Sequence, residues 1–186
     1  MLKLKLHTPR ITIRNMQPGD LEGFLFYRQN PDIVKYQSFG VMTRERAIGF
    51  ISAQQEKVFG VPGEWVQYAV ELNGGAEVIG DCAVQLDCED PRIARVGITI
   101  SHTHQCKGYA REVFKAILEF LFDQVNVHRV EETVDTRNIA SITLLKKMEF
   151  RMEGHFIENI FDEGHWISEY QYAMLKREWD VVKGRI

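Results

Sequence analysis

The chain has 186 residues, of which 45% are hydrophobic and 26% are charged, a composition typical of a globular protein and not of a disordered or fibrous one. This length suits one domain, which we expect to span residues 1–186. A net charge of −3 argues against a nucleic-acid partner that is bound through its phosphates.

Hydrophobic periodicity, turn residues and capping residues predict the elements in order. The patterns predict a strand at residues 8–14, helices at 20–30 and 43–58, strands at 65–72, 77–86 and 93–100, a helix at 108–125, a strand at 128–134, a shorter helix from 138, and strands at about 150–158 and 165–175. The turn Asn73-Gly74-Gly75 indicates a hairpin between two of these strands. This order predicts an α/β (or α+β) protein, in which a twisted mixed sheet of about seven strands is flanked by about four helices.

The cysteines and the hydropathy indicate a reducing, aqueous compartment. Cys82, Cys88 and Cys106 are odd in number and lack a C-x-x-C spacing, which predicts free thiols instead of a disulfide framework or a zinc site. No apolar run reaches the roughly 18 residues of a membrane span. The alternating N-terminus lacks the apolar core of a signal peptide. We therefore expect a cytoplasmic protein without a membrane partner.

The most informative segment lies between the strand at 93–100 and the helix at 108–125. Gly108 stands at the start of this helix, whose first backbone N–H groups have no intrahelical partner and point out of its N-terminus. The helix dipole favours negative charge there, and Lys107 and Arg111 add positive charge. A single glycine can also serve only the turn. From these residues alone, a phosphate site and a plain turn both stay open.

Two motifs in this part of the chain resemble signatures of the GNAT superfamily of N-acetyltransferases. Gln105-x-x-Gly108-x-Ala110, at a strand-to-helix junction, is similar to the family's motif A, Q/R-x-x-G-x-G/A. Asn138-x-x-Ser141 opens the following helix, as in the family's second signature. The resemblance spans essentially the whole chain and is closest to the Rim-type branch, whose founding members acetylate ribosomal-protein N-termini.

The resemblance implies the GNAT fold, acetyl-CoA as co-substrate without a metal, and direct transfer of acetyl to a primary amine. That amine would be a protein N-terminus, an aminoglycoside or other polyamine, or a small amine. Backbone groups would pair with the pantetheine arm and hold the pyrophosphate, and Ser141 would either protonate the leaving thiolate or be an ordinary helix serine. The CoA-binding residues that the resemblance implies are Ile98, Thr99, Ile100, Gln105, Cys106, Lys107, Gly108, Tyr109, Ala110, Arg111 and Asn138.

The chain departs from the family pattern at two positions. Glu149 stands where the family commonly has the glycine that caps the helix before Phe150, which predicts a different turn there. Many Rim-type members carry a glutamate in the strand at 93–100, at the position that is Arg95 in this chain. A general base cannot be transferred onto an arginine.

Asp81 is the alternative carboxylate, because it lies in an otherwise apolar strand that we expect to be central. A buried carboxylate there must be paired or functional. If residues 87–91 form the turn, Asp81 lies opposite or diagonal to Arg95 on one face of the sheet. The two residues are then either a structural ion pair or a catalytic one, in which Asp81 is the base and Arg95 keeps it ionised.

Three alternatives stand beside this hypothesis. Cys106 would be the nucleophile of a covalent intermediate, but its place in motif A faces the phosphates and not the thioester, which disfavours that chemistry. His102-x-His104 lacks a third ligand at metal-binding spacing. A non-catalytic acetyl-CoA sensor with the same fold is the alternative function. The identity of the acceptor amine and homodimer formation stay open.

Overall fold

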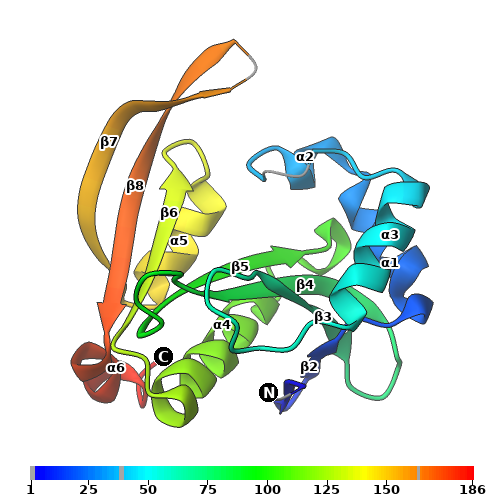
Figure 1. The fold of residues 1–186 in the computed structure, drawn as a ribbon, viewed down its shortest axis with the longest axis horizontal. Coiled ribbons are helices and arrows are strands. Elements are labelled where there is room, and N and C mark those ends of the chain that lie inside the picture. Colours follow the sequence, from blue (N-terminus) through cyan, green and yellow to red (C-terminus); the bar gives the residue numbers. More distant parts are fainter. Residues whose placement is uncertain (1–2, 38–39, 163) are drawn as a thin grey trace.

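The structure is a computed structural model that describes residues 3–37, 40–162 and 164–186. These residues form one eight-stranded sheet with helices on both of its faces (Figure 1). The strands are β1 (Lys5–His7), β2 (Ile11–Asn15), β3 (Val66–Leu72), β4 (Val78–Leu86), β5 (Ile93–Ile100), β6 (Arg129–Asp135), β7 (Arg151–Asp162) and β8 (His165–Leu175). The helices are α1 (Leu21–Arg28), α2 (Pro31–Val34), α3 (Arg44–Gln55), α4 (Tyr109–Glu119), α5 (Ile139–Lys147) and α6 (Lys176–Val182).

The strand order is β1-β2-β3-β4-β5-β6-β8-β7, and all neighbouring strands are antiparallel except β5 and β6. These two are parallel because α4 carries the chain back between them, the crossover that a parallel pair requires. Their ladder pairs Ile93 with Arg129 and Ala94 with Val130. Beyond these pairs the two strands diverge (Figure 1). The sheet therefore splits toward the C-terminal end of β5.

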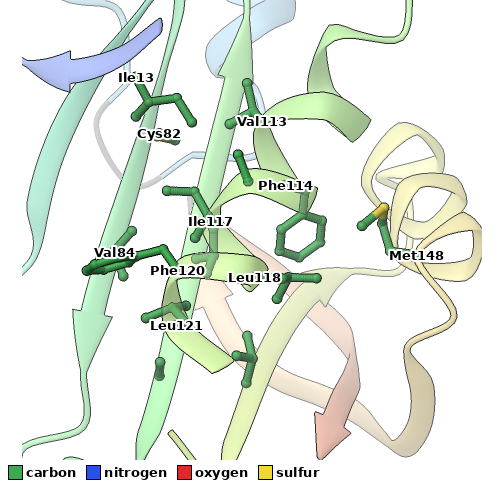
Figure 2. Close-up of a cluster of buried hydrophobic side chains, with 14 of the residues drawn as sticks. Ile13, Cys82, Val84, Val113, Phe114, Ile117, Leu118, Phe120, Leu121 and Met148 are labelled. Atoms are coloured by element: carbon green, nitrogen blue, oxygen red, sulfur yellow. The ribbon is translucent and has the colours of Figure 1, made fainter. Parts of the chain in front are cut away.

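Helix α4 covers one face of the sheet and carries the main core. Its apolar side chains recur every three or four residues, and Phe114, Ile117 and Leu118 are each at most 2% exposed. They pack on alternate residues of β4, among them Cys82 and Val84 (Figure 2). Burying each large apolar side chain of this kind stabilises the fold by about 1.5–3 kcal/mol.

Helices α1 and α3 cover the opposite face of β3 and β4 (Figure 1). Phe24 of α1 and Ile51 of α3 pack there around Ala69 of β3 in a second, smaller core. Because helices cover both faces of β4, its side chains are buried on both faces of the sheet. Asp81 lies opposite Ala69 and therefore shares the α1–α3 face.

The predicted fold class is confirmed, with eight strands in place of about seven. The bounds of β5 match the prediction, and those of the other predicted strands agree within four residues. The patterns missed β1, α2 and α6, because elements of three to seven residues are too short for periodicity to show. The helix predicted to reach residue 125 ends as a π-helical turn over Phe120–Val125. That residues 1–186 form one domain stays a prediction.

Candidate active site

The main chain of β5 presents hydrogen-bonding groups toward β6 beyond the point where the strands stop pairing. The N–H of Val96 points to β6, because it donates to Oε1 of Glu132 at 2.5 Å. Alternate residues of a strand direct their N–H and C=O groups to the same edge. The register with β4 is regular as far as the pair of Gly80 and Ile100. The main-chain groups of Ile98 and Ile100 therefore also point into the gap between β5 and β6.

The loop after β5 has the geometry of an anion site. Gln105 ties it to the strand, since its Nε2 donates to the carbonyl oxygen of the last residue of β5 at 3.1 Å. Cys106 and Gly108 have left-handed backbones, with φ of 59° and 85°, and glycine adopts this conformation without steric cost. The first bond of α4 runs from the N–H of Glu112 to the carbonyl oxygen of Gly108 at 3.2 Å. The N–H groups before Glu112 therefore project from the helix N-terminus toward a place that favours negative charge.

The other predicted loop residues surround this helix start. Lys107 and Arg111 are exposed, whereas Tyr109 and Ala110 pack partly against the main core. The ammonium of Lys107 donates to the carbonyl oxygen of Thr103 at 2.9 Å, within the same loop. The structure thus brings the residues of motif A together at one end of the split sheet.

Arg10, at the start of β2, fastens this loop. Its Nη1 donates to the carbonyl oxygen of Lys107 at 2.9 Å, and its Nε donates to Oε2 of Glu112 at 2.6 Å. Its guanidinium lies 4.5 Å from the centre of the Tyr109 ring, within cation–π range. Burial raises the pKa of the Glu112 carboxyl, but hydrogen bonds from neighbouring threonine and arginine side chains outweigh it and lower the pKa overall. Arg10 therefore holds both sides of the turn before α4, a role that the motif did not indicate.

Asn138 caps α5, because its Oδ1 accepts from the N–H of Ser141 at 3.1 Å. Ser141 is half-buried in the first turn of the helix. At the other end, Glu149 has a left-handed φ of 59°, and its N–H donates to the carbonyl oxygen of Lys146 at 3.1 Å. The expectation of a different turn is wrong, since this glutamate adopts the conformation in which a C-cap glycine is usual. Contacts of Asn138 and Ser141 with CoA stay predictions.

The predicted contact between Asp81 and Arg95 is wrong. Asp81 lies opposite Thr99, four residues along β5 from Arg95. The two side chains share a face of the sheet but are separated by roughly 13 Å along the strand. The cause is the turn between β4 and β5: the last pair of the ladder is Leu86 with Ala94, so the turn spans residues 87–93 instead of 87–91. This longer turn shifts the register by two residues.

Asp81 is instead the centre of a buried cluster. Arg28 donates from Nη2 to Oδ1 at 2.5 Å and from Nε to Oδ2 at 3.0 Å. The hydroxyl of Tyr27 donates to Oδ2 at 2.7 Å, and the side-chain amide of Gln67 donates to Oδ1. Burial, and then the charge of Asp81, raises the pKa of Tyr27 well above its usual value, so its hydroxyl stays a donor. With four donors on a carboxylate that is 1% exposed, the geometry favours a structural role over that of a base.

Gln37 links this cluster to β5. Its side-chain oxygen accepts from Arg28, and its Nε2 donates to Oγ1 of Thr99 at 2.8 Å. Thr99 therefore turns its side chain toward the α1–α3 face, while its neighbours direct main-chain groups toward β6. Ile98 and Ile100 therefore present main-chain groups to the gap between β5 and β6, whereas the side chain of Thr99 is hydrogen-bonded on the α1–α3 face.

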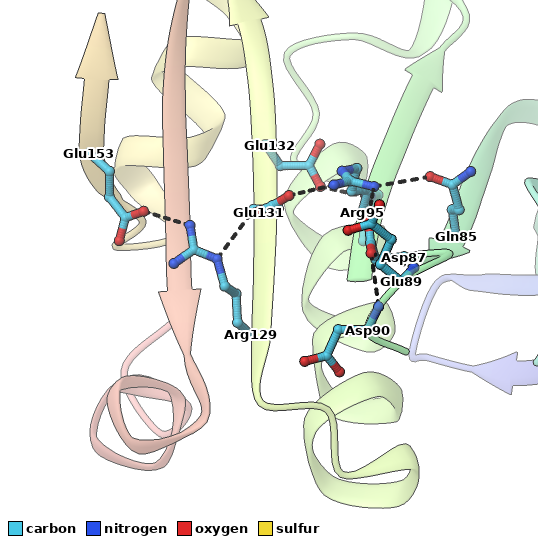
Figure 3. Close-up of polar contacts among 10 residues, drawn as sticks. Gln85, Asp87, Glu89, Asp90, Arg95, Arg129, Glu131, Glu132 and Glu153 are labelled. Carbon is cyan, nitrogen blue, oxygen red and sulfur yellow. Dashed lines mark hydrogen bonds and ion pairs between the residues drawn. The ribbon is translucent and has the colours of Figure 1, made fainter. Parts of the chain in front are cut away.

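Arg95 belongs to a second network, which Figure 3 shows. Its Nη1 donates to Oδ2 of Asp87 at 2.9 Å, and its Nη2 donates to Oε1 of Glu131 at 2.6 Å. Arg129 links two carboxylates: its Nε donates to Oε2 of Glu131 at 3.0 Å, and its Nη2 donates to Oε2 of Glu153 at 2.6 Å. Burial lowers the pKa of Arg95, but hydrogen bonds to the two carboxylates outweigh it and raise the pKa overall. Arg95 therefore stays charged and ties the turn after β4 to β6.

Glu132 is a candidate residue that the sequence analysis missed. It lies between Val130 and Val134, whose side chains are buried in the main core, so an acid interrupts the inward-facing row of β6. Burial raises the pKa of its carboxyl well above the usual range, and the hydrogen bond from Val96 lowers it by less. The signal that singled out Asp81, an acid within an apolar strand pattern, was also present here.

The loop histidines have separate partners. His104 lies 3.7 Å from a carboxylate oxygen of Glu77, and the ring of His102 stacks at 4.9 Å from that of Phe26. Within residues 3–37, 40–162 and 164–186, no group of three or more His, Cys, Asp or Glu side chains could hold a metal ion. In the same described ranges, no helix has the length and apolar character needed to cross a membrane.

Known proteins resemble this chain in sequence or in structure. The acetyltransferase (GNAT) domain model matches residues 10–151. The uncharacterized N-acetyltransferase YnaD of Bacillus subtilis is 31% identical over 177 residues, which cover 95% of this chain and 100% of YnaD. The crystal structure of a GNAT-family acetyltransferase from Bacillus anthracis has a TM-score of 0.83 at 26% identity, covering 94% of this chain and 100% of that one. Spermidine N(1)-acetyltransferase of Vibrio cholerae is 32% identical over 88 residues, 47% of this chain and 51% of that protein. The chain therefore belongs to the GNAT family of acetyltransferases.

Proposed function

We propose that this protein transfers the acetyl group of acetyl-CoA directly to a primary amine. The observation that carries the proposal is a discontinuous run of main-chain donors and acceptors between Ile98 and Arg111. It consists of a strand edge that faces a gap, a loop with a left-handed glycine and a helix N-terminus. In a GNAT acetyltransferase this run suits a pantetheine arm followed by a pyrophosphate.

The residues of the loop fit such a ligand. A Cβ atom at Gly108 would stand 3.4 Å from Nη2 of Arg10, in a backbone conformation that L side chains rarely adopt. Because Gly108 has no side chain and is exposed, a phosphate could approach the main chain at this position. Lys107 and Arg111 are exposed and supply positive charge beside it. Ile98 and Ile100 would pair with the pantetheine amides, and Asn138 would contact the same arm from the start of α5.

When bound, acetyl-CoA supplies a thioester whose carbonyl carbon is attacked by the amine. The protein must orient the amine, stabilise the developing negative charge on oxygen and move a proton from nitrogen to sulfur. The N–H of Ile98 points into the gap and would donate to that oxygen, which leaves the carbonyl group of Ile98 for the pantetheine arm. The hydroxyl of Ser141 is the proposed donor to the sulfur. Asp81 is enclosed by its own donors and takes no part in this step.

We further propose a small cationic amine as the acceptor. A protein with a net charge of −3 attracts cations over a distance, which favours a polyamine. A spermidine acetyltransferase among the relatives supports the same class of acceptor.

The proposal is tested by thiol release from acetyl-CoA in the presence of spermidine, an aminoglycoside or a peptide with a free N-terminus. We expect thiol release with spermidine well above the rate without an amine. Binding of CoA in a calorimeter without thiol release for any amine would overturn the transferase proposal. Turnover with the peptide alone would overturn the choice of a polyamine.

A further inference from the structure

We infer that Glu132, at the point where β5 and β6 separate, is the general base that takes the proton from the attacking amine. The inference rests on the proposed function. It starts from the position of the Glu132 side chain, which Figure 3 shows beside Arg95. Its Oε1 accepts from the N–H of Val96, two residues beyond the last paired residue of β5.

The main chain of β5 gives the direction in which a bound CoA would run. The pyrophosphate end belongs at the loop that follows Ile100, and the pantetheine arm would then extend along β5 toward its N-terminal end. Ile100, Ile98 and Val96 present main-chain groups to the gap in that order. Val96, the last of them, is covered by the carboxyl of Glu132. The reactive end of the arm and this carboxyl therefore meet at the closed end of the split.

The surroundings of Glu132 suit a group that gains and loses a proton. Burial raises the pKa of its carboxyl well above the ordinary range. Its charged neighbours are Arg95 on β5, which lowers the pKa, and Glu131 on β6, which raises it. On β8 it lies opposite the buried Tyr172, which carries a hydroxyl and no charge of its own. A base whose pKa lies closer to the working pH transfers protons more effectively than an ordinary exposed glutamate.

The step balances with the groups already named. The amine nitrogen forms a bond to the carbonyl carbon, and the bond between that carbon and sulfur breaks. The carboxylate of Glu132 takes one proton from the nitrogen, and the hydroxyl of Ser141 gives one to the sulfur. The proton held by Glu132 then returns to the oxygen of Ser141 directly or through solvent. The step starts from the neutral amine, which a cationic acceptor forms by losing one proton to solvent. From there the net products are an amide and the thiol of CoA, with no further proton gained or lost.

A first experiment compares CoA with adenosine 3′,5′-bisphosphate, which lacks the pantetheine arm, by calorimetry in two buffers of different ionisation enthalpy. We expect the heat of CoA binding to depend on the buffer, because the arm changes the ionisation of Glu132. The dependence should vanish for the shorter ligand and in Glu132→Gln. Equal buffer dependence in wild type and Glu132→Gln would overturn the inference. Failure of the wild type to bind CoA would instead overturn the proposed function.

A second experiment measures stability against pH without any ligand. The folded pKa of Glu132 lies above its unfolded value, so the folded protein holds this proton more tightly. Stability should therefore fall as pH rises from the ordinary pKa of a glutamate through the raised one, and it should stay lower above that window. Glu132→Gln should lack this fall and should unfold at a higher temperature than wild type at pH 8. A difference between the two proteins that is independent of pH would contradict the inference.

Turnover gives the third readout, with spermidine as the acceptor. We expect Glu132→Gln to lower kcat by about 100-fold or more while the Kd for CoA changes less than threefold. Glu64→Gln is the matched control, since Glu64 forms a loose ion pair with Lys57 at 3.6 Å near the C-terminal end of β4. If Glu132→Gln keeps the wild-type kcat across pH 6–9, the inference is overturned. The carboxyl then serves only as the hydrogen-bond acceptor of the Val96 N–H.

Discussion

Replacing Asp81 by asparagine tests whether the buried cluster is structural. Asp81 and Arg28 are 1% and 2% exposed, so Asp81→Asn removes a counter-charge from a buried guanidinium. Removing one partner of such a pair costs about 3–5 kcal/mol. The free energy of unfolding of such a domain is about 5–15 kcal/mol, so the loss is a fifth or more of its stability. We expect a much lower midpoint in urea, followed by tryptophan fluorescence, with an unchanged slope.

The control is Glu22→Gln, which breaks the exposed pair of Glu22 with Arg44 and should leave the midpoint where it is. The reasoning fails if Asp81→Asn unfolds at the wild-type urea concentration, binds CoA and loses turnover. That combination would make Asp81 a catalytic group in spite of its four donors. Loss of stability with wild-type turnover per folded molecule would confirm the structural role.

Three further substitutions test the CoA site. Gly108→Val should raise the Kd for CoA at least tenfold in calorimetry, because it puts a β-branched side chain at a φ of 85° on the phosphate path; an unchanged Kd in a folded variant would refute the loop assignment. Asn138→Ala should cost about 1 kcal/mol by removing the cap of α5 and should also slow turnover; equal kinetics with lower stability would leave only the cap. Arg10→Ala should weaken CoA binding by releasing the carbonyl group of Lys107, and a lower unfolding midpoint with an unchanged Kd would limit Arg10 to a structural tie.

Much of the fold could be predicted because the signals are local in the sequence. β5 has its predicted bounds, since a run of apolar and β-branched residues lies between a turn and a loop. The motif around Gly108 lies at the predicted strand-to-helix junction, because glycine conformation and helix capping act over a few residues. The cap at Asn138 follows from the same short-range chemistry.

The rest of the site depends on contacts that the sequence pattern does not contain. The register that separates Asp81 from Arg95 depends on a turn whose length differs by two residues from the expected one. The sequence shows Glu132 as an acid among the inward-facing residues of β6. Its role in the site, however, depends on where β5 and β6 stop pairing. Arg10 acts on a loop that lies about a hundred residues later, and no periodicity reveals such a contact.

The residues of the Asp81 cluster lie far apart along the chain, and this separation indicates when the cluster forms during folding. Tyr27 and Arg28 precede Asp81 by 54 and 53 residues, and Gln37 precedes Thr99 by 62. Closing loops of this length costs entropy before any contact offsets it, so hairpins and helices with neighbouring partners form earlier. We expect the cluster to assemble after the rate-limiting step, and its substitutions should therefore speed unfolding and hardly change refolding. The ion pair then determines how long the native state lasts and has little influence on how quickly it is reached.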